Sequence, residues 1–385
     1  MATPAENLVC AIIRGDVTSW PLLDNCSLNK LVEAAFNHRV QLILFDTLKK
    51  LSTWDRWPPS LRERLKNDFA AACALELIGE RELRKVLICL EEHRIRPILL
   101  KGVPLAYTVY QSPTLRPRED TDLLIRESDM QRVAGILSGL GYDGLELEGA
   151  ELASYQCSYR RRDSYGICHH LDVHWKISNE PLFARTFSFD ELLAEAIEIP
   201  SLARRALGLG HLHALLLACM HRFVHAHAPF YGNGKPVYAG DHLRWVYDIH
   251  LLCSALSAGQ WSEFSTLART KGIAGFCLEG LNTAKEAFNA QIPNEIMGDL
   301  QTAARSETTN VQMLKASRAA WFLANLRALS GWRQRTALIK QAALPPSTYI
   351  MEKYQTSNRL ALPFFYAFRL VNSVSKLFKR SKFQR

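Results

Sequence analysis

Three aspartates and a glycine in the first half of the chain have types and a spacing that could do chemistry. Asp120 and Asp122 form an Asp-x-Asp motif that runs into the apolar residues Leu123–Ile125. Asp172 stands alone in a second apolar stretch, and Gly102 follows a short apolar run upstream of all three acids. A glycine turn, paired acids on one strand and a third acid on a later strand are typical of metal-dependent phosphoryl transfer.

The paired acids are expected on a strand that begins near Arg118 and ends at Ile125. Alternate side chains of a strand share a face, so Arg118, Asp120 and Asp122 are expected to point the same way. Mg²⁺ prefers oxygen ligands, and two metal ions about 3.5–4 Å apart would hold the attacking and leaving oxygens of a phosphoryl transfer. The alternative is a solvated acidic turn before a strand, since short Asp-x-Asp motifs are frequent.

The third acid belongs to an alternating stretch, in which His170, Asp172 and His174 share one face of an expected strand over 167–177. Asp172 could complete the ligand shell of one metal or take the proton from an attacking hydroxyl. His174 could orient a carboxylate or reach the substrate. The alternatives are an acid on the solvated face of an edge strand and a surface histidine.

Four residues around the glycine turn could bind phosphate. Gly102 lets the backbone approach a phosphate closely, and the N–H groups of the helix that follows can hold it. Lys101 could neutralise phosphate charge, and Arg116 and Arg118 could grip a triphosphate with bidentate hydrogen bonds. As alternatives, a Lys-Gly pair is common and arginines in loops are usually solvated.

Two further groups of residues carry weaker signals. His221 and His225 are spaced as neighbours on one helix face and could form a zinc pair, but no third ligand has a diagnostic spacing. Asp241, Arg244 and Asp248 also have helical spacing, and they could line a cleft or form a surface ladder of ion pairs.

The order of expected elements predicts an α+β protein with a small mixed β-sheet core and helical regions on both sides of it in the sequence. We expect an N-terminal helical region over 1–94, a catalytic core over 95–200, a helical domain over 201–300 and a C-terminal helical region over 301–385. A long helix over 61–93, with Ser60 as its N-cap, is expected to lie beside the sheet.

Alternation of strand and helix marks the core. Strands are expected over 98–100, 118–125, 155–161 and 167–177, with helices over 104–110 and 129–140. The last two strands are expected to form a hairpin around a turn at 162–166.

Composition places the chain among cytoplasmic globular proteins. Its 385 residues exceed one small core, and its nine cysteines lack Cys-x-x-Cys spacing, which indicates reduced thiols. The N-terminus has no pattern of a signal peptide, and no apolar run reaches the roughly 18 residues that span a membrane.

Positive charge is concentrated at the C-terminus. The net charge is +9, and the eight basic residues of 353–385, with no acid among them, leave the rest of the chain at about +1. Nucleic acid is therefore not an expected partner of the body. Residues 360–385 have an apolar stripe and a basic opposite face, so this segment could lie on an anionic membrane surface or pack on the protein itself.

Taken together, these segments resemble the uncharacterised prokaryotic nucleotidyltransferase family of the DNA polymerase β superfamily. The resemblance is carried by ILLKGVPLAYTVYQSPTLRPREDTDLLI at 98–125 and by LDVHW at 171–175. It extends to the helical segments 31–48 and 65–93 and to LRWVYDI at 243–249, and it covers about 30–295.

The resemblance implies a small mixed sheet with helices on one side. It also implies Mg²⁺-dependent transfer of a nucleoside monophosphate from an NTP to a hydroxyl, with release of pyrophosphate. The paired metal-binding acids of the superfamily map onto Asp120 and Asp122, and its third acid maps onto Asp172. Two Mg²⁺ ions are the implied cofactors.

The chain departs from the superfamily pattern at the glycine turn. The superfamily usually has Gly-Ser there, whereas Val103 follows Gly102 in this chain. The hydroxyl that would contact the triphosphate is missing, and Lys101 could substitute for it.

These observations leave three functions to compare. The first is a nucleotidyltransferase that modifies a hydroxyl of a small molecule or a protein. The second is a nucleotidyltransferase that acts on an RNA end, which the near-neutral body disfavours. The third is a catalytically inactive binding or scaffold protein with the same fold, which the presence of all three acids disfavours. We expect a cytoplasmic protein, with a peripheral position on the inner face of the membrane as the alternative that the basic tail allows.

Overall fold

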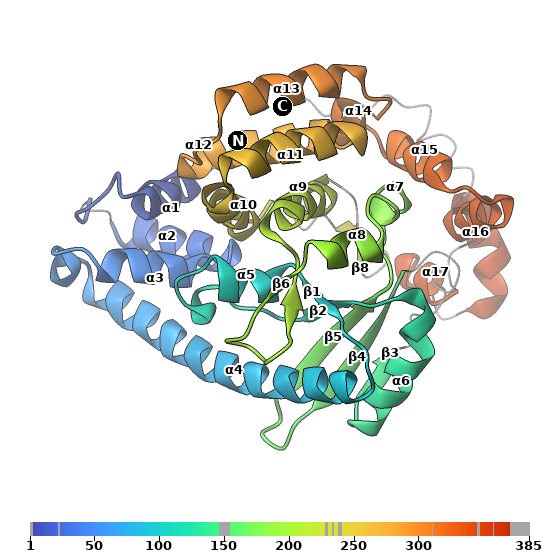
Figure 1. The fold of residues 1–385 in the computed structure, drawn as a ribbon, viewed down its shortest axis with the longest axis horizontal. Coiled ribbons are helices and arrows are strands. Elements are labelled where there is room, and N and C mark those ends of the chain that lie inside the picture. Colours follow the sequence, from blue (N-terminus) through green and yellow to red (C-terminus); the bar gives the residue numbers. More distant parts are fainter. Residues whose placement is uncertain are drawn as a thin grey trace.

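A seven-stranded mixed β-sheet carries the candidate acids (Figure 1). In this computed structural model the described residues are 3–21, 24–145, 155–227, 230–232, 235–237, 241–309, 311–344, 347–356 and 358–369. The strands are β1 (Ile98–Leu100), β2 (Thr121–Leu124), β3 (Asp143–Leu145), β4 (Gln156–Arg162), β5 (Cys168–His174), β6 (Ile197–Glu198) and β7 (Leu207–Gly208). Their order in the sheet is β3-β4-β5-β2-β1-β7-β6.

Two strand pairs in this sheet are parallel, and the other pairs are antiparallel. Strand β2 runs parallel to β5, and β1 runs parallel to β7. The expected hairpin is present as the antiparallel pair β4 and β5. The α+β class and the mixed sheet are therefore confirmed.

One face of the sheet is covered by α4 (Pro59–Glu92) and α6 (Met130–Gly139), as Figure 1 shows. The second half of the 34-residue α4 presents an apolar stripe to the sheet, as its content of strong helix formers and apolar residues predicts. The residues that form this core are Leu83, Val86, Leu87 and Leu90 of α4, Val133 and Leu137 of α6, and Leu99, Leu123, Leu171 and Val173 of the sheet.

The opposite face of the sheet packs against a helical assembly built from the N-terminal helices and from helices that follow the sheet in sequence. Its helices are α1 (Pro4–Arg14), α2 (Asn25–Asn37), α3 (Gln41–Lys49), α9 (His211–His227), α10 (Leu243–Ala255), α11 (Ala258–Thr270), α12 (Ala274–Phe288) and α13 (Asn294–Ser306). One continuous apolar core joins these helices to Ile98, Leu100 and Leu124 of the sheet. The N-terminal helices and the later helical domain therefore share a core.

Several boundaries differ from those expected. Helix α4 begins at Pro59 with Pro58 as its N-cap, so Ser60 is not the cap; proline suits the first helical position because its missing N–H would be unsatisfied there. The strand expected from Arg118 begins only at Thr121, after the 3-10 turn at Pro113–Leu115. Strand β7 lies beyond residue 200, where the core was expected to end, because a two-residue strand has no periodicity to reveal it.

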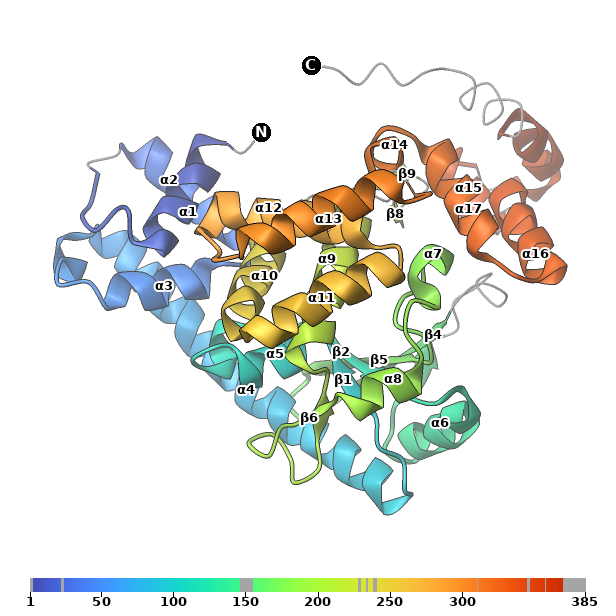
Figure 2. The ribbon, with the colours of Figure 1, turned by 45° about the horizontal axis from the view of Figure 1, so that its top comes forward.

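Short helices complete the fold. They are α5 (Gly102–Thr108), α7 (Pro181–Ala184), α8 (Phe189–Ala194), α14 (Val311–Ala316), α15 (Arg318–Ala328), α16 (Trp332–Ala343) and α17 (Ser347–Lys353). Helix α15 lies beside α7 (Figure 2), and its Asn325 amide donates a hydrogen bond of 2.8 Å to Glu180, the N-cap residue of α7. Of the expected amphipathic segment at 360–385, residues 370–385 lie outside the described residues. None of the described helices is both long and apolar enough to cross a bilayer.

Candidate active site

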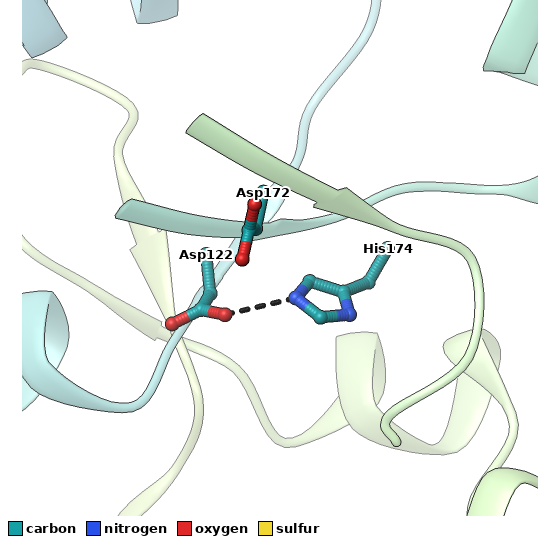
Figure 3. Close-up of side chains that lie close together, drawn as sticks. All are labelled: Asp122, Asp172 and His174. Carbon is teal, nitrogen blue, oxygen red and sulfur yellow. Dashed lines mark hydrogen bonds and ion pairs between the residues drawn. The ribbon is translucent and has the colours of Figure 1, made fainter. Parts of the chain in front are cut away.

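The parallel pairing of β2 and β5 brings the separated acids together. Asp122 pairs in register with Asp172, so both side chains leave the same face of the sheet from adjacent strands. His174 follows two residues later on that face, and Figure 3 shows Asp122, Asp172 and His174 converging. Asp120 lies directly before β2 and lines the same cavity. The three aspartates predicted as metal ligands therefore border one space.

Asp122 is the most buried of these acids, at 3% exposed. Its Oδ1 accepts hydrogen bonds from Lys101 Nζ at 2.6 Å and from His174 Nε2 at 2.8 Å. Burial alone would raise the pKa of Asp122, but the Lys101 ammonium and the His174 hydrogen bond outweigh it and hold the pKa well below its ordinary value. Asp122 is thus ionised although it is buried.

The pKa of Asp120 is shifted in the opposite direction. Burial, followed by repulsion from the Asp122 carboxylate, raises the pKa of Asp120 above its ordinary value. A divalent cation bound between the two carboxylates would offset the repulsion that Asp122 exerts on Asp120.

The donor set fits a divalent cation. One ligand atom from each of Asp122, Asp172 and His174 lies within 4.8 Å of the others, and within the described parts of the chain no other cluster of this kind is found. Carboxylate oxygens are the hard ligands that Mg²⁺ prefers, whereas His174 already contacts Asp122 and so serves to orient that carboxylate. Since His174 is 2% exposed, the alternative of a surface histidine is wrong.

Asp172 is oriented from the neighbouring strand β4. The Ser158 hydroxyl donates a hydrogen bond of 2.6 Å to Asp172 Oδ1, and the Gln156 amide lies 3.4 Å from Oδ2. Ser158 pairs directly with Asp172 in the hairpin register. Neither partner was predicted from the sequence, although the predicted hairpin locates both once its register is known.

Lys101 occupies a strained backbone position between β1 and α5. Its φ of 55° and ψ of −122° are rare for any residue other than glycine, and such conformations cost about 1–3 kcal/mol. The turn directs the ammonium to Asp122, as the bond of 2.6 Å shows. Strain of this kind persists where the surrounding structure enforces it, and it is common at functional sites.

Arg116 joins the sheet to the helical domain. Its Nε and one terminal nitrogen donate hydrogen bonds of 2.8 and 2.7 Å to the two oxygens of Asp248 in α10, and the Tyr110 hydroxyl donates a third, of 2.7 Å. Gly102 permits this arrangement, because a Cβ there would lie 3.2 Å from the Arg116 guanidinium.

Arg118 lines the cavity but is also paired with a carboxylate. Its guanidinium lies 3.2 Å from Glu76 of α4, and both side chains are 10% exposed. Each arginine that was predicted to bind phosphate therefore has a carboxylate partner already. Their roles as phosphate ligands stay predictions.

The cavity has a volume of about 380 Å³, within the usual range for a small-molecule site. The sheet forms one wall, with the aspartates and Lys101, and α9 and α10 form the other. The residues of the helical wall include His221, His225, Arg244, Trp245 and Asp248.

The polar residues of 221–248 are divided between the cavity and other contacts. Arg244 and Asp248 are buried and line the cavity, whereas Asp241 pairs with Arg222 of α9 and not with Arg244. The rings of His221 and His225 lie 4.1 Å apart, and burial lowers the pKa of His225 to about 4. The described residues offer this histidine pair no third metal ligand.

Comparison with known proteins agrees with this geometry. Residues 25–289 match the family described as uncharacterised nucleotidyltransferase, which covers more than half of the chain. The chain therefore belongs to that family, as its sequence motifs predicted. The comparisons with curated proteins and with solved structures found no match.

The buried pair of Arg116 and Asp248 gives a stability prediction. Asp248→Asn removes the charge that compensates Arg116, so we expect the free energy of unfolding to fall by about 3–5 kcal/mol. As a control, Asp190→Asn breaks the exposed ion pair with Arg126 and should leave stability near the wild-type value. Urea unfolding monitored by circular dichroism measures both. Equal midpoints for the two variants would contradict the prediction.

The strained backbone at Lys101 gives a second prediction. Lys101→Ala and Lys101→Gly both remove the ammonium, but only glycine relieves the positive φ, so the glycine variant should be more stable by about 1–2 kcal/mol. The same two substitutions at Lys85, inside helix α4, should give the reverse order by about 1 kcal/mol. Thermal unfolding of the four variants checks this. If Lys101→Ala is more stable than Lys101→Gly, the backbone at residue 101 is not strained.

Proposed function

We propose that this protein is an Mg²⁺-dependent nucleotidyltransferase that transfers a nucleoside monophosphate from an NTP to a hydroxyl of a small molecule or a protein. The observation that carries the proposal is the convergence of Asp120, Asp122 and Asp172 on one cavity, in a chain that belongs to a nucleotidyltransferase family.

The reaction would proceed as an in-line displacement at the α-phosphorus of the NTP. The acceptor oxygen forms a new bond to phosphorus, the bond from phosphorus to the bridging oxygen breaks, and pyrophosphate leaves. In this proposal Asp172 accepts the proton of the acceptor hydroxyl. The hydrogen bond from Ser158 to its Oδ1, which fixes the direction of the carboxylate, supports this role.

Asp120, Asp122 and Asp172 would hold the Mg²⁺ ions, which when bound neutralise the charge on the phosphate oxygens. We propose two such ions. Lys101 holds Asp122 ionised and adds a positive charge beside the phosphates. This charge would replace the serine hydroxyl that the superfamily has at the position of Val103. Helices α9 and α10 form the far wall of the cavity and would limit access of competing water to the reacting phosphorus.

The size of the cavity and the small net charge of the chain outside its C-terminal segment favour a small acceptor group over a nucleic acid. A volume of about 380 Å³ suits a nucleotide and one reacting group. A polynucleotide would need a basic track, and the chain outside its C-terminal segment has a net charge of only about +1. The remaining alternative is an inactive binding protein, to which the Val103 departure points.

We propose a cytoplasmic location on the basis of the thiols. All nine cysteines are free in the structure, and four of them are buried in the core. Free cysteines in this number are usual in a reducing compartment.

Nucleotide binding provides the test of the donor site. With Mg²⁺ and a panel of NTPs, we expect the wild-type protein to be stabilised, by about 2.7 kcal/mol when the ligand is present at a hundred times its Kd. Asp120→Asn/Asp122→Asn should lose this effect because it removes the metal ligands. Asp143→Asn, which changes an exposed residue of strand β3, should keep it. Differential scanning fluorimetry measures the shift. If no NTP stabilises the wild-type protein, the inactive binding protein becomes the better account.

The C-terminal segment provides a further test. We propose that residues 360–385 bind an anionic membrane surface, because Leu360 and Phe364 are exposed, at 91% and 66%, at the start of a basic stretch. Deletion of 358–385 should abolish co-sedimentation with anionic liposomes, and neutral liposomes serve as the control. Equal sedimentation with and without the segment would rule this out.

A further inference from the structure

The helical wall of the cavity contains a buried arginine with an incomplete set of partners. Arg244 of α10 is 8% exposed, and one of its terminal nitrogens donates a hydrogen bond of 2.9 Å to the carbonyl of Pro117. Its Nε is buried and has no hydrogen-bond partner among the described residues. A buried donor without a partner is costly, so it indicates a group that the cavity receives from outside.

The nearby carboxylate does not satisfy Arg244. Asp248 acts on Arg244 electrostatically, but its two oxygens already accept hydrogen bonds from Arg116 and Tyr110. Burial, followed by repulsion from Arg116, lowers the pKa of Arg244 to about 9, although an arginine ordinarily titrates above 12. This wall therefore has an excess of buried positive charge.

Arg39 adds to this excess from the loop after α2. It also lowers the pKa of Arg244, after burial and Arg116, and it lines the same cavity. Its own partner is Glu119, at 2.7 Å, in a pair whose side chains are 34% and 69% exposed. An exposed pair of this kind is weak, so the Arg39 guanidinium can turn to another anion.

Arg244 and Arg39 line the same cavity as the acids, in an arrangement that suits a ligand with several linked phosphates. Arg244 acts on Asp120 electrostatically, and both line the cavity with Lys101 and Asp122. The backbone N–H of Arg244 lies 3.3 Å from the His38 carbonyl, which ties the start of α10 to the loop that carries Arg39. An anion that extends from the acidic sheet wall would meet these guanidinium groups.

We propose that Arg244, assisted by Arg39, binds the terminal phosphates of the NTP donor. The proposal rests on the proposed function and names a phosphate subsite within that cavity. Guanidinium groups bind phosphate oxygens with strong, charge-assisted hydrogen bonds. Arg116 is less suited because two of its nitrogens already bind Asp248. The terminal nitrogens of Arg118 also lack hydrogen-bond partners in the part of the chain that the structure describes, but its guanidinium lies beside Glu76 and Gly79 of α4 and not on the helical wall. The Mg²⁺-binding acids would then hold the reacting end of the triphosphate and α10 its other end.

Inorganic tripolyphosphate tests the subsite directly, because it carries the phosphates and needs no assumption about the base. We expect Arg244→Gln to weaken its binding in the presence of Mg²⁺ by about 10- to 100-fold, as for the loss of charged hydrogen bonds. Arg39→Gln should weaken binding less, and Arg269→Gln, an exposed arginine of α11, should not change it. Isothermal titration calorimetry measures the affinities, with NTP and NMP titrated in parallel.

The comparison of ligands separates this role from a structural one. Arg244→Gln should weaken the binding of NTP and tripolyphosphate but leave NMP binding unchanged, whereas general damage to the cavity would weaken all three. Arg39→Gln, at a half-buried position, keeps the test decisive if Arg244→Gln does not fold. Wild-type affinities for tripolyphosphate in both arginine variants would overturn the proposal.

The outcomes also separate this proposal from the proposed function. NTP binding that is equal in the wild-type protein and both arginine variants would refute the phosphate subsite and leave the donor site standing. Tripolyphosphate binding that depends on Arg244, without binding of any NTP, would refute the donor and leave an anion site. If orthophosphate binds at the arginines without competing with NTP, the arginine subsite would belong to a phosphorylated acceptor. This result would overturn the proposal.

Discussion

The site depends on holding several carboxylates close together in a partly buried space. Adjacent parallel strands place Asp122 beside Asp172, and Asp120 precedes Asp122 by two residues. Burial, followed by repulsion from the neighbouring Asp122 carboxylate, raises the pKa of Asp120 above its ordinary value. Lys101 and His174 hold the pKa of Asp122 below its ordinary value, whereas the Lys101 charge offsets the rise in the pKa of Asp120 only in part. The protein therefore neutralises the acids only in part, and a divalent cation bound between them would reduce the remaining repulsion.

The two walls of the cavity come from separate parts of the chain, and one buried interaction sets their spacing. Arg116 follows the glycine turn that carries Lys101, and Asp248 belongs to the helix that carries Arg244. Gly102 makes room for the guanidinium that joins them. The glycine that was predicted to approach a phosphate thus also lets the sheet wall meet the helical wall. Binding geometry and stability are coupled through this pair.

The sequence revealed the parts of the site that depend on local pattern. Alternation predicted the shared face of Asp172 and His174, and the hairpin around 162–166 is confirmed. The pairing of β2 with β5, the Ser158 partner of Asp172 and the two-residue β7 depend on strand register, which local pattern does not specify. The partners of Arg116 and Arg118 are remote in sequence for the same reason, so their buried pairing was not foreseen.

The most direct measurement is a crystal structure of the full chain with Mn²⁺ and a non-hydrolysable NTP analogue, using anomalous scattering to locate the metal. We predict anomalous density bound by Asp120, Asp122 and Asp172, with the triphosphate between these acids and helix α10. Metal at another position, or a nucleotide bound outside this cavity, would contradict the account, because the convergence of the three carboxylates would then have no part in binding the donor.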